Sequence, residues 1–282
     1  LYLTIAGILN VILNLFFVIV CKMAADGVAL ASVISQYVSA ILVVWHMMRL
    51  NDACKFYFQR LRFHGDEVGR ILGLGVPAGI QHMIFAIANL FIQAAVNSFD
   101  STMVSGNAAA ANTDTIIYNI MMAFYTACST FMGQNWGAGH KKRMMDSYLI
   151  SLFYAFAVAA VLGVAFYFAG RPFLYVFTNS ADVVEAGMQR MKIMCFSYAI
   201  SAFMDNTIAA CRGLGRTIVP TVVVIMGSCV FRVIWVYTIF AHYHTIPSLY
   251  LLYAFSWTIT AAAEIVYFLH CFRKLRLVPE TA

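Results

Sequence analysis

The apolar stretches of this chain contain four ionisable side chains, Asp114, Asp205, Arg232 and Glu264. Each costs about 2.5–3.5 kcal/mol at the centre of a helix surrounded by hydrocarbon. A charge at that cost is kept where it meets a partner, a ligand or a water-filled cavity. These four residues are therefore the first candidates for binding chemistry.

Asp205 falls on one helical face with Ser197 and Ser201, because residues four apart face the same way on an α-helix. A desolvated carboxyl group there can hold a proton or a cationic ligand, but not both at full strength. We expect this competition to link the two ligands. The alternative interpretation is a salt bridge with Arg212, about two turns further along the same helix.

Polar side chains also recur every four residues in other apolar stretches, and such stripes predict helices arranged around a polar cleft. In membranes, Ser, Thr and Asn also form packing contacts between helices, and that alternative stays open for each of them. Gly106 and Ala108–Ala111 are expected to be close-packing residues. The predicted substrate-binding or ion-binding residues are Gln81, Asn89, Gln93, Asp114, Tyr118, Ser201, Asp205, Arg232 and Glu264.

Asp114 and Arg232 are predicted to lie at the same depth, each about two turns from the same end of the bundle. A structural ion pair between them and a role in transport are both compatible with that placement. Glu264 is expected to be a buried structural group near the inner surface, and His82 a packed one. The seven cysteines are scattered without a CxxC pair, so we expect neither a metal site nor a disulfide framework.

The elements that position these residues are predicted to be membrane helices. Only 11% of the residues are charged, against about 25% in soluble domains. A membrane span needs about 20 apolar residues. Eight stretches qualify, which predicts an all-α integral membrane protein, at roughly 1–21, 27–48, 71–97, 107–132, 146–169, 189–211, 217–240 and 248–271.

The basic residues predict the orientation. Of the 18 Lys and Arg residues, 13 fall in loops on one side, and by the positive-inside rule that side is cytoplasmic. Arg171, Arg190 and Lys192 are assigned to the opposite, outer side. We expect no nucleic-acid binding, because no basic stripe exists outside these loops.

Three segments carry a family resemblance: 75–99, 211–220 (CRGLGRTIVP) and, most specifically, 105–144 (SGNAAAANTDTIIYNIMMAFYTACSTFMGQNWGAGHKKRM). They resemble the second half of a MATE (multidrug and toxic compound extrusion) transporter. The resemblance implies a twelve-helix protein of two six-helix lobes. It also implies that this chain is a fragment: 1–49 as the last two helices of the first lobe, 50–69 as a cytoplasmic linker, 70–276 as the second lobe and 277–282 as a cytoplasmic tail. Some sodium-coupled members of that family carry an acid in the helix matching 71–97, and this chain has none there.

The resemblance and the polar stripes predict a secondary active exporter of amphipathic, often cationic, small molecules in the cell membrane. Its coupling ion would be H⁺ or Na⁺, without a further cofactor, and we expect a monomer in contact with membrane lipids. The alternative is a flippase for a lipid-linked oligosaccharide or a related precursor. We expect no enzyme, because HExxH and GxSxG motifs are absent.

Overall fold

The computed structural model describes residues 2–51 and 55–275, and this part is helical without a strand. It contains eight helices that are long and apolar enough to cross a membrane, which confirms the predicted all-α class. They are Tyr2–Val20 (α1 and η1), α2 Ala25–Arg49, α3 Gly65–Val96, α4 Ser101–Gly137, α5 Lys141–Leu174, α6 Ala181–Gly213, Ile218–Tyr243 (α7 to α9) and α10 Ile246–Lys274.

The chain divides into two compact units, Leu1–Gly65 and Asp66–Ala282. In the first unit, α1 and α2 pack against each other as a helical pair. Asn10 donates a hydrogen bond to Ser35 at 3.1 Å, and Gly27 allows the chain to approach Phe17 closely. Residues 52–54 of the predicted linker and the whole of the predicted 277–282 tail lie outside the described residues.

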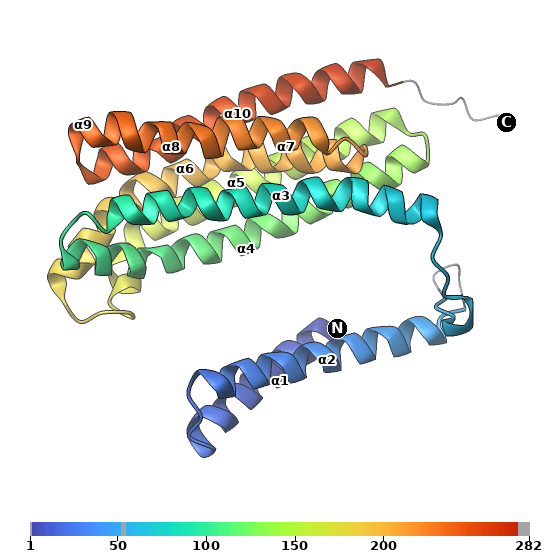
Figure 1. The fold of residues 1–282 in the computed structure, drawn as a ribbon, viewed down its shortest axis with the longest axis horizontal. Helices are drawn as coiled ribbons and strands as arrows, with labels where there is room; N and C mark the ends of the chain where they lie inside the picture. The colour runs from blue at the N-terminus through green and yellow to red at the C-terminus, as the bar shows by residue number, and fades with distance from the viewer. Residues whose placement is uncertain (1, 52–54, 276–282) are drawn as a thin grey trace. The chain divides into compact units, whose positions relative to one another are not determined.

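The second unit is a bundle of the six remaining spans, which lie side by side in Figure 1. Helix α6 is the most buried of them and packs against α4, α5 and α10. Small residues make this possible, since Ala202, Ala209 and Ala210 on α6 are fully buried. The other helices of this unit therefore assemble around α6, which also carries Asp205.

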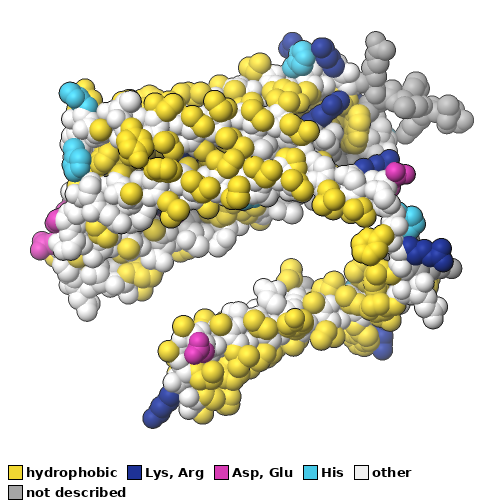
Figure 2. All heavy atoms as spheres, in the orientation of Figure 1, with side chains coloured by type: hydrophobic (Ala, Val, Ile, Leu, Met, Phe, Trp, Pro, Cys, Tyr) yellow, Lys and Arg dark blue, Asp and Glu magenta, His cyan; other side chains and the backbone are white. Residues whose placement is uncertain are grey.

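The outer surface of the second unit is apolar over its length, as a hydrocarbon environment requires. Figure 2 shows hydrophobic side chains along its flank and Lys and Arg side chains gathered at the end where α10 finishes. Phe168 and Val266 are among the exposed hydrophobic residues, with 78% and 69% of their surface accessible. This is the charge distribution on which the predicted orientation depends.

Most helices extend beyond their predicted ends. The largest correction concerns α6, which begins at Ala181 instead of 189. Arg190, which the prediction placed at the outer end of this helix, therefore lies about two and a half turns inside it, because the polar first turns of α6 lowered the mean hydropathy there. Arg190 is a buried residue of the helix, with only 8% of its surface exposed. A second arginine, besides Arg232, is therefore available inside the bundle to pair with an acidic side chain.

Candidate functional site

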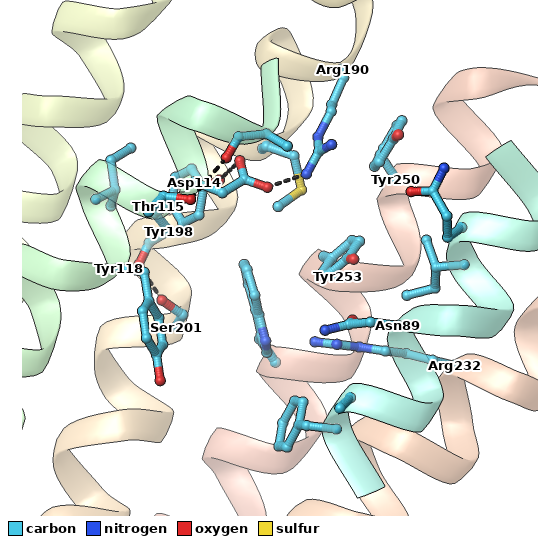
Figure 3. A pocket seen from close by; sticks show the side chains of 18 of the residues that line it. Asn89, Asp114, Thr115, Tyr118, Arg190, Tyr198, Ser201, Arg232, Tyr250 and Tyr253 are labelled. Carbon is cyan, nitrogen blue, oxygen red and sulfur yellow. Dashed lines mark hydrogen bonds and ion pairs between the residues drawn. The ribbon is translucent and has the colours of Figure 1, made fainter. Parts of the chain in front are cut away.

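A cavity of about 620 Å³ lies within the second unit, between α3, α4, α6, the seventh span and α10. The sticks in Figure 3 show its polar and aromatic lining. Eight of the nine predicted site residues line it, and Glu264 is the exception. Those eight are Gln81, Asn89, Gln93, Asp114, Tyr118, Ser201, Asp205 and Arg232.

Asp114 of α4 and Arg190 of α6 form an ion pair at one side of the cavity (Figure 3). Tyr198 donates its hydroxyl to the same carboxylate. The other terminal nitrogen of Arg190 donates to the side-chain and main-chain oxygens of Asn107, at 2.7 and 3.1 Å. Tyr250 of α10 also donates to Asn107, so these contacts tie α4, α6 and α10 together.

The predicted ion pair between Asp114 and Arg232 is wrong. Asp114 is already engaged by Arg190, which projects from α6 at the same level of the bundle. Arg232 is almost completely buried, with 2% of its surface exposed, and its Nε donates to Ser256 at 3.4 Å. Among the described residues it forms no ion pair, and its Nη2 has no hydrogen-bond partner.

Three aromatic rings surround the Arg232 guanidinium. Its Cζ lies 4.4 Å from the ring centroid of Tyr253, 5.3 Å from Phe85 and 5.7 Å from Trp257. Cations are attracted to aromatic faces at such distances, so the rings partly compensate the charge that lacks a carboxylate partner. All four side chains line the cavity.

Asp205 faces the cavity from α6 without a hydrogen bond or an ion pair in the part of the chain that the structure describes. The alternative salt bridge with Arg212 is not formed. Arg212 instead donates to the hydroxyl of Tyr125 and, at 2.9 Å, to Oε1 of Gln81. Asp205 stays within electrostatic range of Arg212 and Arg232. Its carboxyl group is therefore available to a ligand in the cavity.

The remaining predicted polar residues divide into two groups. Gln81 accepts from Thr221 at 3.3 Å as well as from Arg212, and Ser201 donates to the carbonyl of Tyr198 at 2.8 Å. These bonds are contacts within the bundle, which is the alternative to ligand binding that the sequence left open. Asn89 and Tyr118 are exposed residues of the cavity lining without a side-chain hydrogen bond in the described structure, and Gln93 donates to Asn97, just beyond the end of α3.

Glu264 lies away from the cavity in the interior of the bundle. It is fully buried, and neither of its carboxyl oxygens has a hydrogen-bond partner in the described structure. On the same face of α10, Thr260 shares a hydrogen bond with Ser228 at 3.1 Å. Glu264 is thus buried, as expected, while its structural role stays a prediction. Across residues 2–51 and 55–275, no three His, Cys, Asp or Glu side chains gather as metal ligands would.

Sequence inspection missed several residues of the lining. Arg190 lies seven residues before Ser197 and eleven before Ser201, a spacing that places all three on one helical face, so its signal was available. Tyr250, Tyr253 and Trp257 had no comparable signal, because an aromatic residue in a membrane helix looks the same whether it faces lipid, protein or a cavity.

The bundle and its polar cavity define the class first: a multi-pass membrane protein with a cavity between its helices. The MatE family model matches residues 77–238, more than half of the chain, and the chain belongs to this family of membrane transporters. The probable multidrug resistance protein YpnP of Bacillus subtilis (strain 168) is 28% identical over 197 residues, which cover 70% of this chain and 44% of that protein.

Two further comparisons give a more distant relative and the fold. An FAD transporter of Shewanella oneidensis is 24% identical over 191 residues, covering 64% of this chain and 41% of that protein. The chain thus spans less than half the length of these two curated relatives. A multidrug resistance MATE family transporter solved in an outward-facing conformation has the same fold, with a TM-score of 0.86, 18% identity, and coverage of 95% of this chain and 60% of that chain.

Proposed function

We propose that this chain belongs to a secondary active transporter that exports amphipathic organic molecules across the cell membrane. The observation that carries the proposal is the cavity itself, in which Asp205 lies among aromatic and Met side chains and has no hydrogen-bond or ion-pair partner among the described residues. Met and aromatic surfaces adapt to varied ligands. The names of the relatives, multidrug resistance protein and FAD transporter, support export or transport of organic molecules.

In the proposed mechanism Asp205 couples the two fluxes. A proton, or Na⁺ in its place, and the cationic part of a substrate compete for the same carboxylate. Binding of the ion releases the substrate, and binding of the substrate releases the ion. Alternating access of the cavity to the two sides of the membrane, an element of the proposal, would convert this competition into antiport.

The flippase alternative has less support. A lipid-linked oligosaccharide with a diphosphate would favour a cleft with several free cations, but Arg190 in this cavity is neutralised by Asp114. Arg232 is the cation left without an acidic partner among the described residues. The match to a transporter family, together with the missing catalytic motifs, supports a protein that is not an enzyme.

The test compares Asp205→Asn with Glu264→Gln in the full gene product. Both changes convert a carboxyl group inside the same bundle to an amide, but Glu264 is fully buried, whereas Asp205 is partly exposed and lines the cavity. Asp205→Asn should slow dye efflux driven by an imposed ion gradient by about tenfold or more, a loss of at least about 1.4 kcal/mol of transition-state stabilisation. Dye binding should also lose its pH dependence.

The matched control, Glu264→Gln, should leave efflux near the wild-type rate. Membrane levels of both variants are measured by quantitative blotting, so that a folding defect is not counted as a transport defect. Normal, pH-sensitive efflux by Asp205→Asn would remove Asp205 from the coupling mechanism.

A further inference from the structure

Arg232 is a buried cation that faces a cavity and has no acidic partner in the described part of the chain. It projects from α8 (Phe231–Trp235) and points into the cavity in Figure 3. Its Nε donates to Ser256, whereas Nη2 has no partner at all. A buried donor on a charged group is costly unless something else accepts its hydrogen bond.

The second arginine of the cavity has acceptors for both of its terminal nitrogens, although its Nε, like Nη2 of Arg232, has no hydrogen-bond partner in the described structure. Arg190 has a carboxylate, Asp114, and two oxygens of Asn107 as acceptors. Arg232 has one hydroxyl and three ring faces. The rings hold the guanidinium plane in place, but aromatic faces cannot accept the full set of five N–H donors. The missing acceptor is what a ligand would supply.

Asp205 makes the charge requirement of the cavity more specific. It is the counterpart of Arg232, an acid without a partner in the same cavity, and the two are within electrostatic range but do not form an ion pair. A monocation would meet Asp205 but would also be repelled by Arg232. A molecule that carries both charges would neutralise both side chains.

We propose that Arg232 is an anion-binding subsite of this cavity, and that the preferred substrates are aromatic molecules carrying a carboxylate, sulfonate or phosphate in addition to a cationic group. The proposal rests on the proposed function, in that it takes the cavity as the substrate site. The planar guanidinium fork matches such oxyanions through two parallel hydrogen bonds. The amide of Asn89, which also points into the cavity (Figure 3), is free to donate a further one.

The test uses a pair of dyes that differ by one anionic group: a rhodamine methyl ester, which is a monocation, and its free acid, which is a zwitterion. Binding to the purified full gene product in nanodiscs is measured by fluorescence polarisation. The wild-type protein should bind the free acid more tightly than the ester. Arg232→Gln should weaken binding of the acid by about tenfold or more, while binding of the ester stays the same or improves.

Two further variants sharpen the comparison. Arg232→Lys keeps the charge but loses the fork, so it should bind the acid with intermediate affinity. Arg171→Gln is the matched control, because Arg171 is an exposed residue paired with Glu185 at 2.7 Å, away from the cavity lining. It should bind both dyes as the wild-type protein does.

The proposal is overturned if the wild-type protein binds the ester as tightly as the acid, or if Arg232→Gln weakens both dyes equally, as a structural role would require. Should the Arg232 variants fail to fold, competition on the wild-type protein decides. Benzenesulfonate should then displace the acid more effectively than benzyltrimethylammonium displaces it, and the reverse order contradicts the subsite. If the protein transports neither dye, the proposed export function is contradicted. The ratio of the affinities for the acid and the ester still tests the role of Arg232.

Discussion

Asp114 shows how a carboxylate can be accommodated inside a helical bundle in an apolar chain. Its charge is matched by Arg190, and Tyr198 donates to it as well. Removing one member of a buried ion pair leaves the other charge uncompensated, which costs far more than the pair contributes in net stability. The pair therefore acts as a constraint on how α4 and α6 meet.

The first residue-scale prediction follows from this constraint. Asp114→Asn and Arg190→Gln should each lower the thermal midpoint of the purified protein, and the double variant should recover part of the loss. We expect a coupling free energy of about 0.5–3 kcal/mol in the double-mutant cycle. Thermal unfolding is monitored by light scattering without an added dye. The fraction of protein that still elutes as a single species from a size-exclusion column after heating is a second readout.

The control cycle combines Asp114→Asn with Arg232→Gln. These residues do not pair in the described structure, so their effects on the thermal midpoint should add. Coupling in the control cycle with additivity in the first would mean that Asp114 and Arg232 are partners after all.

At this scale the sequence predicted most of the cavity lining but not its pairing. A four-residue repeat of polar side chains is enough to identify Gln81, Asn89 and Gln93 as residues of one face. Which cation reaches Asp114 depends on the length of α6 and on how helices cross, and neither is encoded in a periodic pattern. The spacing of Arg190 from Ser197 and Ser201 could have placed it on the cavity face, but its pairing with Asp114 could not be predicted for that reason.

At the scale of elements, α4 and α6 meet at two glycines. A Cβ atom added to Gly106 would lie 2.7 Å from the backbone nitrogen of Gly187 and 2.7 Å from the carbonyl oxygen of Val183. Both neighbours are main-chain atoms, so neither can move without the helix. Of the small residues expected to serve close packing, Gly106, Ala109 and Ala110 are buried, whereas Ala108 and Ala111 line the cavity. The close approach at Gly106 sets the distance at which Arg190 meets Asn107 and Asp114.

Gly106→Ala should force α4 and α6 apart and destabilise the protein by about 1–3 kcal/mol, the usual cost of overpacking. The matched control is Gly133→Ala on the same helix, where the added Cβ would make an ordinary contact of 3.6 Å with Gly213. The control should be neutral, or more stable by up to about 1 kcal/mol, because glycine disfavours the helix. Equal thermal midpoints for the two variants would contradict the close approach seen here.

Hydropathy predicted that eight helices exist but not where they end or how regular they are. Helix α4 begins at Ser101 because the side chain of Asp100 accepts a hydrogen bond from the backbone nitrogen of Met103 at 3.2 Å. In the seventh span, π-helical turns interrupt the α-helix at Ile225–Val230 and Val236–Phe240, on either side of α8. Such turns depend on packing partners, and no spacing of apolar residues announces them.

At the scale of the whole molecule, the predicted orientation can be tested at two exposed turns of the second unit. In a background without native cysteines, Ala138→Cys, after α4, should react with an impermeant maleimide only from the cytoplasmic side. Asn179→Cys, before α6, should react only from outside. The basic residues that follow α4 are the physical reason, since they are retained on the cytoplasmic face. The opposite labelling pattern would invert the topology of the bundle.

Trp257 gives this protein a built-in fluorescent reporter. Of the four tryptophans, it is the one that lines the cavity, and its ring lies 5.7 Å from the Arg232 guanidinium. The emission wavelength of an indole follows the polarity of its surroundings. With Trp45, Trp136 and Trp235 replaced by Phe, the fluorescence of the remaining residue should shift whenever a ligand displaces water from the cavity, so that occupancy can be followed in real time without a labelled substrate.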